Sequence, residues 1–403
     1  MRRLRLGALA LAFFAIPLQA QKFEGLALTP PMGWNSWNRF GCNVDEKLIR
    51  ETADAMVASG MRDAGYQYVN IDDCWHGTRD SLGFIRPDPQ RFPSGMKALA
   101  DYVHAQGLRI GIYSDAGDKT CGGRPGSRGY ESQDALTYAR WGIDYLKYDW
   151  CNTQGLAAVG AYTTMRDALH RAGRPIVFSV CEWGDNKPWD WAKPVGHLWR
   201  TTGDITHCWD CEQDHGIWSS WGILRILDKQ KGLRVHAGPG HWNDPDMMEV
   251  GNGMTVNEDR AHFSMWAMLA APLIAGNDLR TMSAESRAIL LNREVIAIDQ
   301  DSLGVQGWAY ESSPSGVEIW FKPLANGDWA MAVLNRAATP QPVHFDFAHE
   351  YLSDGHSKRE AKFGEITYAI RDLWARRELG TTARPLAATV PGHDVLMLRL
   401  VKR

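Results

Sequence analysis

Two aspartates that could cleave a glycosidic bond lie at the ends of two strand-like segments. Residues 143–149 (IDYLKYD) end in Asp149, and residues 199–204 (WRTTGD) end in Asp204. Glycoside hydrolysis needs two carboxyl groups, because one must stay ionised at the anomeric carbon while the other holds a proton for the departing oxygen. On a strand, Lys147 shares a face with Asp149, and its positive charge favours the ionised carboxylate. We therefore expect Asp149 to be the nucleophile.

Acidic residues recur at the carboxyl ends of further strand-like segments. Each would be an ordinary aspartate by itself, but the set is regular and comprises Asp72, Asp73, Asp115, Asp149, Asp204, Asp244, Asp246 and Asp278. A (β/α)8 barrel assembles its site from the loops that leave the carboxyl ends of successive strands. The pattern therefore predicts an α/β chain with a (β/α)8 TIM barrel, in which acidic side chains gather at one face.

The chain supplies eight strand candidates and most of the helices that such a barrel requires. The strands are expected to begin near Met32, Tyr66, Leu108, Ile143, Pro175, His197, Val235 and Pro272. Helical spacing of apolar residues is found over 45–63, 95–106, 132–141, 155–172, 217–231, 258–269 and 284–298. The connection after the fifth strand leaves little room for a full helix. We place the barrel at residues 21–303.

The pattern changes after residue 303. Segments 316–323, 329–335, 342–347 and 394–400 alternate or run apolar, and turns such as Asn326-Gly327-Asp328 separate them. They predict an antiparallel β-sandwich domain over residues 304–403. This domain has few clustered acids, so we expect it mainly to pack against the barrel.

The first twenty residues differ in kind from the rest. A basic head is followed by a short apolar core and by Leu18-Gln19-Ala20, a plausible cleavage site, which predicts a signal peptide over residues 1–20 and a secreted or periplasmic protein. Loss of the leader removes three arginines and takes the formal net charge from −3 to about −6. A mildly acidic surface argues against nucleic acid or an anionic membrane as a partner.

Export favours disulfide formation, so the possible pairing of the seven cysteines has to be considered. Two pairs, Cys42 with Cys74 and Cys121 with Cys151, follow adjacent strands and could link neighbouring loops at the catalytic rim. Cys208 and Cys211 form a CxxC beside His207 and His215, which could hold zinc, but a single CxxC is weak support for a metal. A local disulfide or free thiols are the favoured alternatives.

Aromatic and acidic residues at the strand ends are suited to bind a sugar. Eighteen tryptophans are many for this length, and an aromatic ring offers a flat apolar face to the C–H face of a pyranose. We expect Trp34 and Trp183 to be such platforms, and Asp72 and Asp73 to accept hydrogen bonds from sugar hydroxyls. The alternative for Asp73 is a carboxylate that caps a loop.

The motifs taken together resemble the α-galactosidases (melibiases) of glycoside hydrolase family 27. They are MGWNSW (32–37), NIDDCW (70–75), GIYSDAG (111–117), LKYD (146–149), RTTGD (200–204) and WNDPDM (242–247). The resemblance implies a retaining, exo-acting enzyme that needs no metal or organic cofactor, with Asp149 as nucleophile and Asp204 as acid/base. It implies a sugar subsite formed by Trp34, Asp72, Asp73, Tyr113, Lys147, Cys181, Trp183, Arg200 and Asp246, and the disulfides Cys42–Cys74 and Cys121–Cys151.

Several alternatives remain open at this point. The segment Cys181-Glu182-Trp183 resembles that of the galactosidases, and a bulky Trp183 is expected to exclude the 2-acetamido group that an α-N-acetylgalactosaminidase accepts. A β-L-arabinopyranosidase is the other alternative within the family, against which the Asp72-Asp73 pair argues weakly. A secreted galactose-binding protein without catalysis would lack one of the two carboxylates. The partner is expected to be an α-galactoside oligosaccharide or a polysaccharide side chain; the oligomeric state is left open.

Overall fold

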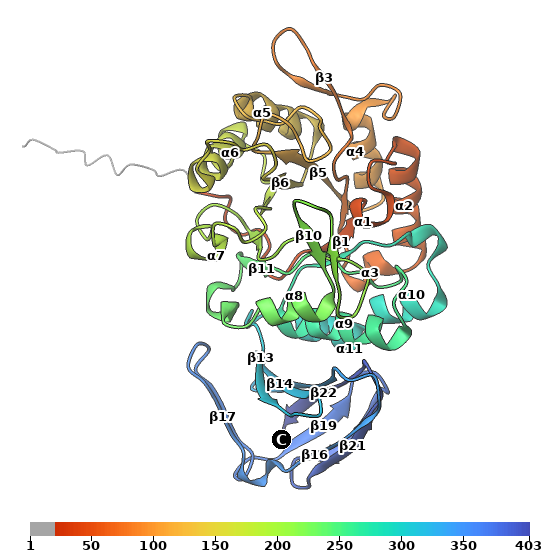
Figure 1. Cartoon of the computed structure of the whole chain (residues 1–403), viewed down its shortest axis with the longest axis vertical. Helices are drawn as coiled ribbons and strands as arrows, with labels where there is room; N and C mark the ends of the chain where they lie inside the picture. Colours follow the sequence, from red (N-terminus) through yellow and green to blue (C-terminus); the bar gives the residue numbers. More distant parts are fainter. Residues whose placement is uncertain (1–20) are drawn as a thin grey trace, which may run out of the picture.

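The computed structural model describes residues 21–403, and the predicted leader over residues 1–20 lies outside the described residues. The described chain forms a barrel that carries the helices, with an antiparallel β-domain at one end of it (Figure 1). None of the helices in residues 21–403 has the length and apolar character needed to cross a membrane.

Eight parallel strands form the curved sheet of the barrel, in the order β11-β8-β7-β6-β5-β2-β1-β12. Their bounds are β1 Met32–Asn35, β2 Tyr68–Asn70, β5 Arg109–Asp115, β6 Tyr145–Asp149, β7 Val177–Val180, β8 Leu198–Arg200, β11 Trp242–Asp244 and β12 Leu273–Ala275. The two outer strands are linked through Met248, whose N–H donates to the Ile274 oxygen at 2.7 Å and whose carbonyl accepts from Gly276 at 3.0 Å. The predicted (β/α)8 fold is confirmed.

The helices surround this sheet. They are α1 Trp37–Phe40, α2 Glu46–Ala58, α3 Met61–Ala64, α4 Gly95–Ala105, α5 Glu131–Trp141, α6 Ala158–Ala172, α7 Pro188–Trp191, α8 Ile223–Lys229, α9 Val256–Leu269, α10 Ala284–Leu290 and α11 Arg293–Asp299. Local sequence sets several of their starts: Asp45 accepts from the Leu48 N–H at the start of α2, and Thr255 and Glu258 form a capping box at α9. The short α7 follows the fifth strand, where little room for a helix was expected.

Two barrel elements differ from the sequence-based expectation. The strand expected near Val235 is a 3-10 helix over Leu233–His236 (η1), and the seventh strand begins only at Trp242. Val235 is 55% exposed, so this apolar residue does not belong to the hydrophobic core. The helix expected over 217–231 begins at Ile223, because residues before it form a hairpin of β9 (Glu212–Asp214) and β10 (Ser219–Trp221).

Two smaller differences concern the barrel surface. The last predicted helix, 284–298, is two helices, since the Asn292 side chain accepts from the N–H groups of Glu294 and Val295 and starts α11. A second hairpin, β3 (His76–Arg79) with β4 (Ile85–Pro87), extends from the loop after β2 and was not predicted.

The C-terminal domain is antiparallel, as predicted. Its main sheet has the order β13-β14-β15-β22-β19-β20, and the pairs β16/β21 and β17/β18 lie beside it. The bounds are β13 Trp308–Ser312, β14 Val317–Pro323, β15 Trp329–Asn335, β16 Gln341–Phe345, β17 Tyr351–Asp354, β18 Arg359–Lys362, β19 Tyr368–Asp372, β20 Arg377–Thr381, β21 Leu386–Val390 and β22 Val395–Lys402, with a 3-10 turn, η3, at Phe347–His349. Strands β13 and β17 to β21 were missed, because short or polar strands carry little periodic signal.

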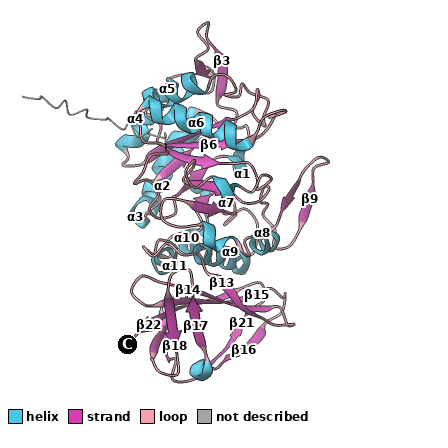
Figure 2. Cartoon of the chain, turned by 90° about the vertical axis from the view of Figure 1, so that its left-hand side faces the viewer, coloured by secondary structure: helices cyan, strands magenta, loops and turns pink. Residues whose placement is uncertain are grey.

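Helices α9 and α11 lie between the barrel and this domain (Figure 2). The buried ammonium group of Lys322, on β14, donates to the carbonyl oxygens of Ala267 at 2.9 Å and Ile298 at 2.7 Å, which belong to these two helices. Ion pairs also cross the boundary: Arg336–Asp228, Arg234–Asp354, Arg371–Glu294 and Arg260–Asp394. The barrel and the β-domain are therefore joined by both apolar packing and directed polar contacts.

Candidate active site

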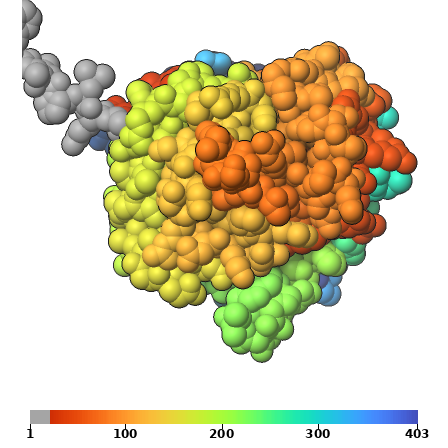
Figure 3. Space-filling model, turned by 90° about the horizontal axis from the view of Figure 1, so that it is seen from above, coloured from red at the N-terminus to blue at the C-terminus, as the bar shows by residue number. Residues whose placement is uncertain are grey.

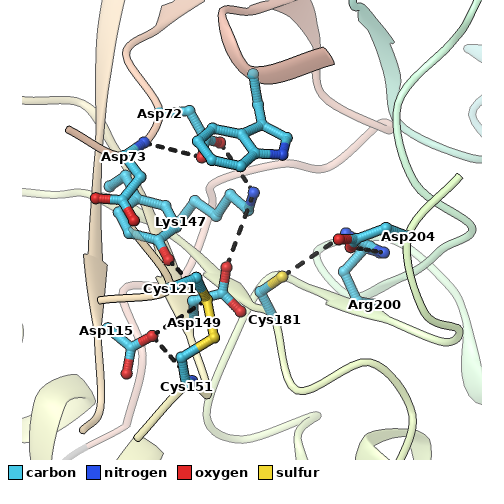
Figure 4. A network of polar contacts seen from close by, with 12 residues as sticks. Asp72, Asp73, Asp115, Cys121, Lys147, Asp149, Cys151, Cys181, Arg200 and Asp204 are labelled. Carbon is cyan, nitrogen blue, oxygen red and sulfur yellow. Dashed lines mark hydrogen bonds and ion pairs between the residues drawn. A yellow bond between two sulfur atoms is a disulfide. The ribbon is translucent and has the colours of Figure 1, made fainter. Parts of the chain in front are cut away.

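A cleft of about 1010 Å³ opens at the carboxyl ends of the barrel strands. It brings together most of the predicted site residues, namely Asp72, Asp73, Tyr113, Lys147, Asp149, Trp183, Arg200, Asp204 and Asp246. These residues come from six separate segments of the chain. Figure 4 labels ten residues of this region and marks the polar contacts among the residues drawn. The spatial convergence that the strand-end pattern predicted is present for this set.

Asp149 is the last residue of β6 and is almost fully buried. Its Oδ2 lies 4.0 Å from Nζ of Lys147, and its Oδ1 accepts a hydrogen bond of 3.0 Å from the Trp150 N–H. Burial raises the pKa of the Asp149 carboxyl to about 6, the Lys147 charge opposes this rise, and the nearby carboxylates of Asp204 and Asp72 add to it. The charge of Lys147 therefore offsets part of the free-energy cost of ionising the Asp149 carboxyl in a buried position.

Asp204 follows β8 in a more solvated position. Its side chain is 38% exposed, compared with 7% for Asp149. Arg200 holds it in place, since Nη2 of Arg200 lies 3.0 Å from Oδ1 of Asp204 and 2.8 Å from Oδ2 of Asp246. In Figure 4, Asp149 and Asp204 lie on opposite sides of Cys181. The two carboxyl groups thus have clearly different surroundings, which is what two different roles require.

Asp72 and Lys147 form a second close ion pair in the cleft. Nζ of Lys147 is 2.9 Å from Oδ2 of Asp72, which also accepts from Nδ2 of Asn35 at 2.8 Å. Lys147 was expected to favour the ionised form of Asp149, but its nearer ion-pair partner is Asp72. Because the pairing crosses from β6 to the end of β2, sequence spacing alone did not reveal it.

Asp73 lines the cleft and at the same time caps the loops around it. Its Oδ2 accepts from the Gly122 N–H at 2.7 Å and its Oδ1 from the Cys74 N–H at 2.6 Å. Burial raises the pKa of Asp73, while these backbone hydrogen bonds oppose the rise. The loop-capping interpretation of Asp73 is therefore realised in the structure alongside its place in the cleft.

Two disulfides fix the loops at this rim. Cys42 is joined to Cys74, and Cys121 to Cys151, in the same pairs that the family resemblance implied. The Tyr113 hydroxyl donates to the Cys121 sulfur at 3.3 Å, so the second disulfide contacts a cleft residue directly. Asp115, Cys121 and Cys151 are the one group of potential metal ligands within residues 21–403, but two of its three members share a disulfide bond and are not thiolates.

Trp34 does not reach the cleft, contrary to the expectation. Its side chain is fully buried in β1, and its indole N–H donates to the Asn277 oxygen at 2.7 Å. Trp37, three residues later, lines the cleft instead. Strand residues of a barrel are covered on both faces, whereas Trp37 follows the strand end, where the backbone turns at α1 and the side chain reaches the rim.

Cys181 also lies outside the cleft. It lines a separate cavity of about 30 Å³, to which Lys147, Arg200 and Asp246 also contribute. Its sulfur accepts a long hydrogen bond of 3.7 Å from Nη1 of Arg200, and burial raises the pKa of the thiol. Cys181 therefore lies beside residues that line the cleft and contacts one of them, Arg200. Trp183, two residues on, has a φ of 61° and lines the cleft as expected.

Three of the strand-end aspartates serve the scaffold. Asp115 accepts from the N–H groups of Cys151 at 2.9 Å and Gly117 at 2.7 Å. Asp244 is oriented toward its own loop, accepting from the Asp246 N–H at 2.9 Å. Asp278 pairs with Arg280 at 2.9 Å. None of the three lines the cleft.

Sequence reasoning missed a second group of cleft residues. They are Trp37, Asn38, Trp150, Asn152, Thr153, Gln154, Leu156, Asp185, Asn186, Gly203, Met247 and, in the β9–β10 hairpin, Ile217, Trp218, Ser219 and Trp221. Most of them follow strands in loops without periodic patterns. The one feature of the sequence that could have identified them as cleft residues is their position next to the acidic motifs. Cys208 and Cys211, at the base of the hairpin, form a local disulfide, so their sulfurs are not available as zinc thiolates.

Comparison with known proteins shows similarity over nearly the whole chain. Residues 29–301 match the family described as alpha galactosidase A, and residues 314–400 match the alpha galactosidase C-terminal beta sandwich domain. The chain is 61% identical to alpha-galactosidase A of Cellvibrio japonicus, over 99% of this chain and 98% of that protein.

Two solved structures have the same architecture. Alpha-galactosidase I of Mortierella vinacea is 37% identical with a TM-score of 0.86, covering 93% of this chain and 98% of that one. The alpha-galactosidase of Saccharomyces cerevisiae solved with raffinose is 33% identical with a TM-score of 0.86, covering 94% and 99%.

Proposed function

Because the chain belongs to the α-galactosidases of glycoside hydrolase family 27, we propose that it releases terminal α-linked D-galactose with retention of configuration. The chain is an α-galactosidase, a glycoside hydrolase. The retaining route and the roles of individual residues are the proposal. One observation carries it: Asp149 and Asp204 line the same cleft in contrasting environments, one buried beside a lysine and the other solvated beside an arginine.

The first step of the proposed reaction forms a covalent intermediate. An oxygen of Asp149 attacks the anomeric carbon, the bond from that carbon to the leaving oxygen breaks, and Asp204 gives its proton to the leaving oxygen. The charge of Lys147 favours the ionised form of Asp149 in the free enzyme. Burial makes the carboxylate poorly solvated, so it needs less reorganisation when it forms the new bond.

The second step releases galactose. Asp204, now a carboxylate, accepts a proton from a water molecule as the water oxygen attacks the anomeric carbon and the bond to Asp149 breaks. Arg200 suits this cycle, because its guanidinium contacts Asp204 and Asp246 together and can hold the Asp204 side chain in one position in both protonation states.

The galactose subsite is proposed to include Asp72, Asp73, Tyr113, Lys147 and Trp37. Carboxylates and the lysine ammonium group form charge-assisted hydrogen bonds with sugar hydroxyls, and the Trp37 ring supplies an apolar face. Trp183 is proposed to restrict the space around the substituent at carbon 2. Such a restriction favours galactose over its 2-acetamido analogue, the alternative sugar within the family.

The stereochemical outcome tests the retaining route. Proton NMR of a reaction with a rapidly cleaved α-galactoside should show α-galactose as the first product, before mutarotation. Incubation with 5-fluoro-α-D-galactosyl fluoride, which slows release of the intermediate, should add a fluorogalactosyl mass to the peptide that contains Asp149. First formation of β-galactose, or a label on another peptide, would reject the proposed roles.

Export and domain organisation are further proposals. The basic and apolar leader over residues 1–20 supports secretion or a periplasmic location, which suits a chain whose structure has three disulfides in residues 21–403. We place the catalytic barrel at residues 21–303 and the β-domain at 304–403. Mass spectrometry of the exported protein should give an N-terminus at Gln21; an intact Met1 on the exported chain would contradict the leader.

A further inference from the structure

The β9–β10 hairpin stands out from the body of the barrel (Figure 3, green). Its tip carries Ile217, which is 99% exposed, and Trp218, which is 49% exposed. Large apolar side chains at such exposure usually mark a binding surface when they gather in one place. Both residues also line the catalytic cleft, together with Ser219 and Trp221 of the same hairpin. The hairpin is therefore one wall of the cleft.

The hairpin is built to hold the Trp218 ring in one orientation. The rings of His215 and Trp218 are stacked with centroids 4.0 Å apart and planes inclined by 23°. The backbone N–H of His215 donates to the backbone carbonyl oxygen of Trp218 at 2.9 Å, and the ring Nε2 of His215 lies 3.0 Å from the Ser220 hydroxyl. One face of the indole is therefore occupied by histidine, and the partly exposed ring is already ordered before a ligand arrives.

The base of the hairpin is tied to the acid/base residue. The Trp221 N–H donates to the Asp204 carbonyl at 2.9 Å, and Thr206 donates to the Trp221 carbonyl at 2.9 Å. The Cys208–Cys211 disulfide and a hydrogen bond of 2.9 Å from Gly222 to the Cys211 oxygen close this base. The hairpin thus cannot move far without moving the backbone of Asp204.

This connection determines which part of a substrate meets the hairpin. An acid/base residue protonates the leaving oxygen, so the leaving group lies on the side of Asp204. This side is away from Asp72 and Lys147, the buried side chains of the proposed galactose subsite. A cleft of about 1010 Å³ lies at the upper end of the range for ligands of drug size, which leaves space beyond one sugar ring.

We infer that the β9–β10 hairpin binds the first sugar of the leaving group, with Trp218 as the stacking platform. The inference rests on the proposed role of Asp204 and extends the proposed function to the substrate class: galactosides of oligosaccharides and polysaccharides. Polar groups around the ring favour a sugar over a lipid chain, since Ser219 lies next to Trp218 and Asn152 and Gln154 line the same cleft. A sugar presents both apolar C–H faces and hydroxyls, and this surface offers a partner to each.

The test compares substrates that share galactose and differ in the leaving group. Wild type, Trp218→Ala and Trp218→Phe are assayed on melibiose, octyl α-galactoside and α-galactosyl fluoride, whose leaving groups are a sugar, an alkyl chain and a single atom. For Trp218→Ala we expect the ratio of kcat/KM on melibiose to that on the fluoride to fall roughly 3- to 10-fold, mainly through KM. Trp218→Phe, which keeps an aromatic face, should restore most of the ratio.

A matched control comes from the β-domain. Tyr351 is an aromatic residue with the same 49% exposure, on β17 and outside the cleft. Tyr351→Ala should leave the melibiose-to-fluoride ratio unchanged. An unaltered ratio in Trp218→Ala would overturn the inference, as would an equal loss on octyl galactoside, which would mark a general apolar surface. Failure of the wild type on galactosyl fluoride would instead reject the proposed catalytic function.

Sugar transfer gives an independent measurement. In the second step a hydroxyl of an added glucose can replace water: its oxygen bonds to the anomeric carbon, the bond to Asp149 breaks, and Asp204 takes the hydroxyl proton. With galactosyl fluoride as donor, the fraction of galactose transferred to glucose rather than to water reports occupation of the leaving-group site. This fraction should fall in Trp218→Ala and stay the same in Tyr351→Ala; an unchanged fraction in Trp218→Ala would contradict the assignment.

Discussion

Nζ of Lys147 lies 4.0 Å from Oδ2 of Asp149, on the same face of strand β6. Burial and the neighbouring carboxylates raise the pKa of Asp149 to about 6, and the lysine opposes that rise. The lysine also holds Asp72 at 2.9 Å, so one buried cation balances both the proposed nucleophile and a carboxylate of the proposed galactose subsite. Lys147 is thus the positively charged neighbour that favours the ionised form of Asp149, against burial and the carboxylates of Asp204 and Asp72.

Replacement of Lys147 by methionine should therefore change the pH dependence of the enzyme. Without the positive charge the pKa of Asp149 rises further, and the nucleophile must be ionised to react. Activity is lost as the pH falls through that pKa, so the acidic limb of kcat/KM should move to higher pH by about one unit. The measurement is a pH profile with galactosyl fluoride. A lower rate with the acidic limb in its original place would show that Lys147 acts only on Asp72.

Asp149→Asn should abolish turnover while the protein stays folded. An amide cannot form the galactosyl ester, and loss of a nucleophile typically costs about 10⁴-fold or more in kcat. Asp278→Asn is the matched control, because Asp278 also follows a barrel strand but pairs with Arg280 outside the cleft. It should retain normal kcat. Turnover by Asp149→Asn within tenfold of wild type would remove Asp149 from the mechanism.

Asp204→Ala should retain activity on substrates that need no proton on the leaving group. Galactosyl fluoride should react at a rate closer to wild type than melibiose does, and added azide should accelerate turnover by attacking the covalent intermediate. The product, identified by NMR, should be α-galactosyl azide. In Asp149→Ala the same anion can only attack the substrate directly and would give the β-azide. A β-azide from Asp204→Ala would reverse the two assignments.

Trp183→Ala should relax the choice of sugar at carbon 2. The smaller side chain opens space in the cleft, so the ratio of kcat/KM for the 2-acetamido substrate to that for the galactoside should rise on the order of 10-fold. The p-nitrophenyl α-glycosides of both sugars provide the assay. Trp150→Ala, at another cleft tryptophan, serves as the comparison and should not change this ratio. A constant ratio in Trp183→Ala would place the selectivity elsewhere.

Asp354→Asn should lower stability in a pH-dependent way. Asp354 on β17 pairs with Arg234 of the barrel at 2.8 Å. Burial raises its pKa, but hydrogen bonds from Arg234 and Ser357 outweigh this and lower the pKa to about 2. A carboxyl group of this kind stabilises the fold above its unfolded pKa of about 4, and the stabilisation is lost as the pH falls towards about 2.

The difference in Tm between wild type and Asp354→Asn should thus be present at neutral pH and shrink below about pH 4. Glu360→Gln on the adjacent strand β18 is the control, because Glu360 has no ion pair within residues 21–403. Its Tm should follow wild type across the range. A Tm difference for Asp354→Asn that grows on acidification would contradict the assigned contact.

The sequence by itself determined the fold class, the family and the group of acids at the strand ends. A buried parallel strand appears in the sequence as a run of apolar residues, and an amphipathic helix appears as apolar residues at helical spacing. Both patterns can be recognised within a short stretch of the chain. Where the local signal was misleading, the prediction was wrong: Val235 is apolar but exposed, and residues 217–222 have helical spacing but lie largely in the hairpin that contains β10.

The tertiary structure decided which of the candidate residues face the cleft. Trp34 and Trp37 belong to one motif, yet the first is buried against Asn277 and the second reaches the rim. Lys147 meets Asp72 between the ends of β6 and β2, and the β9–β10 hairpin folds back onto Asp204 within the long connection between β8 and α8. The Lys147 contact depends on the order of the strands around the barrel, and the hairpin contact depends on how a long loop folds back on itself; local residue spacing predicts neither.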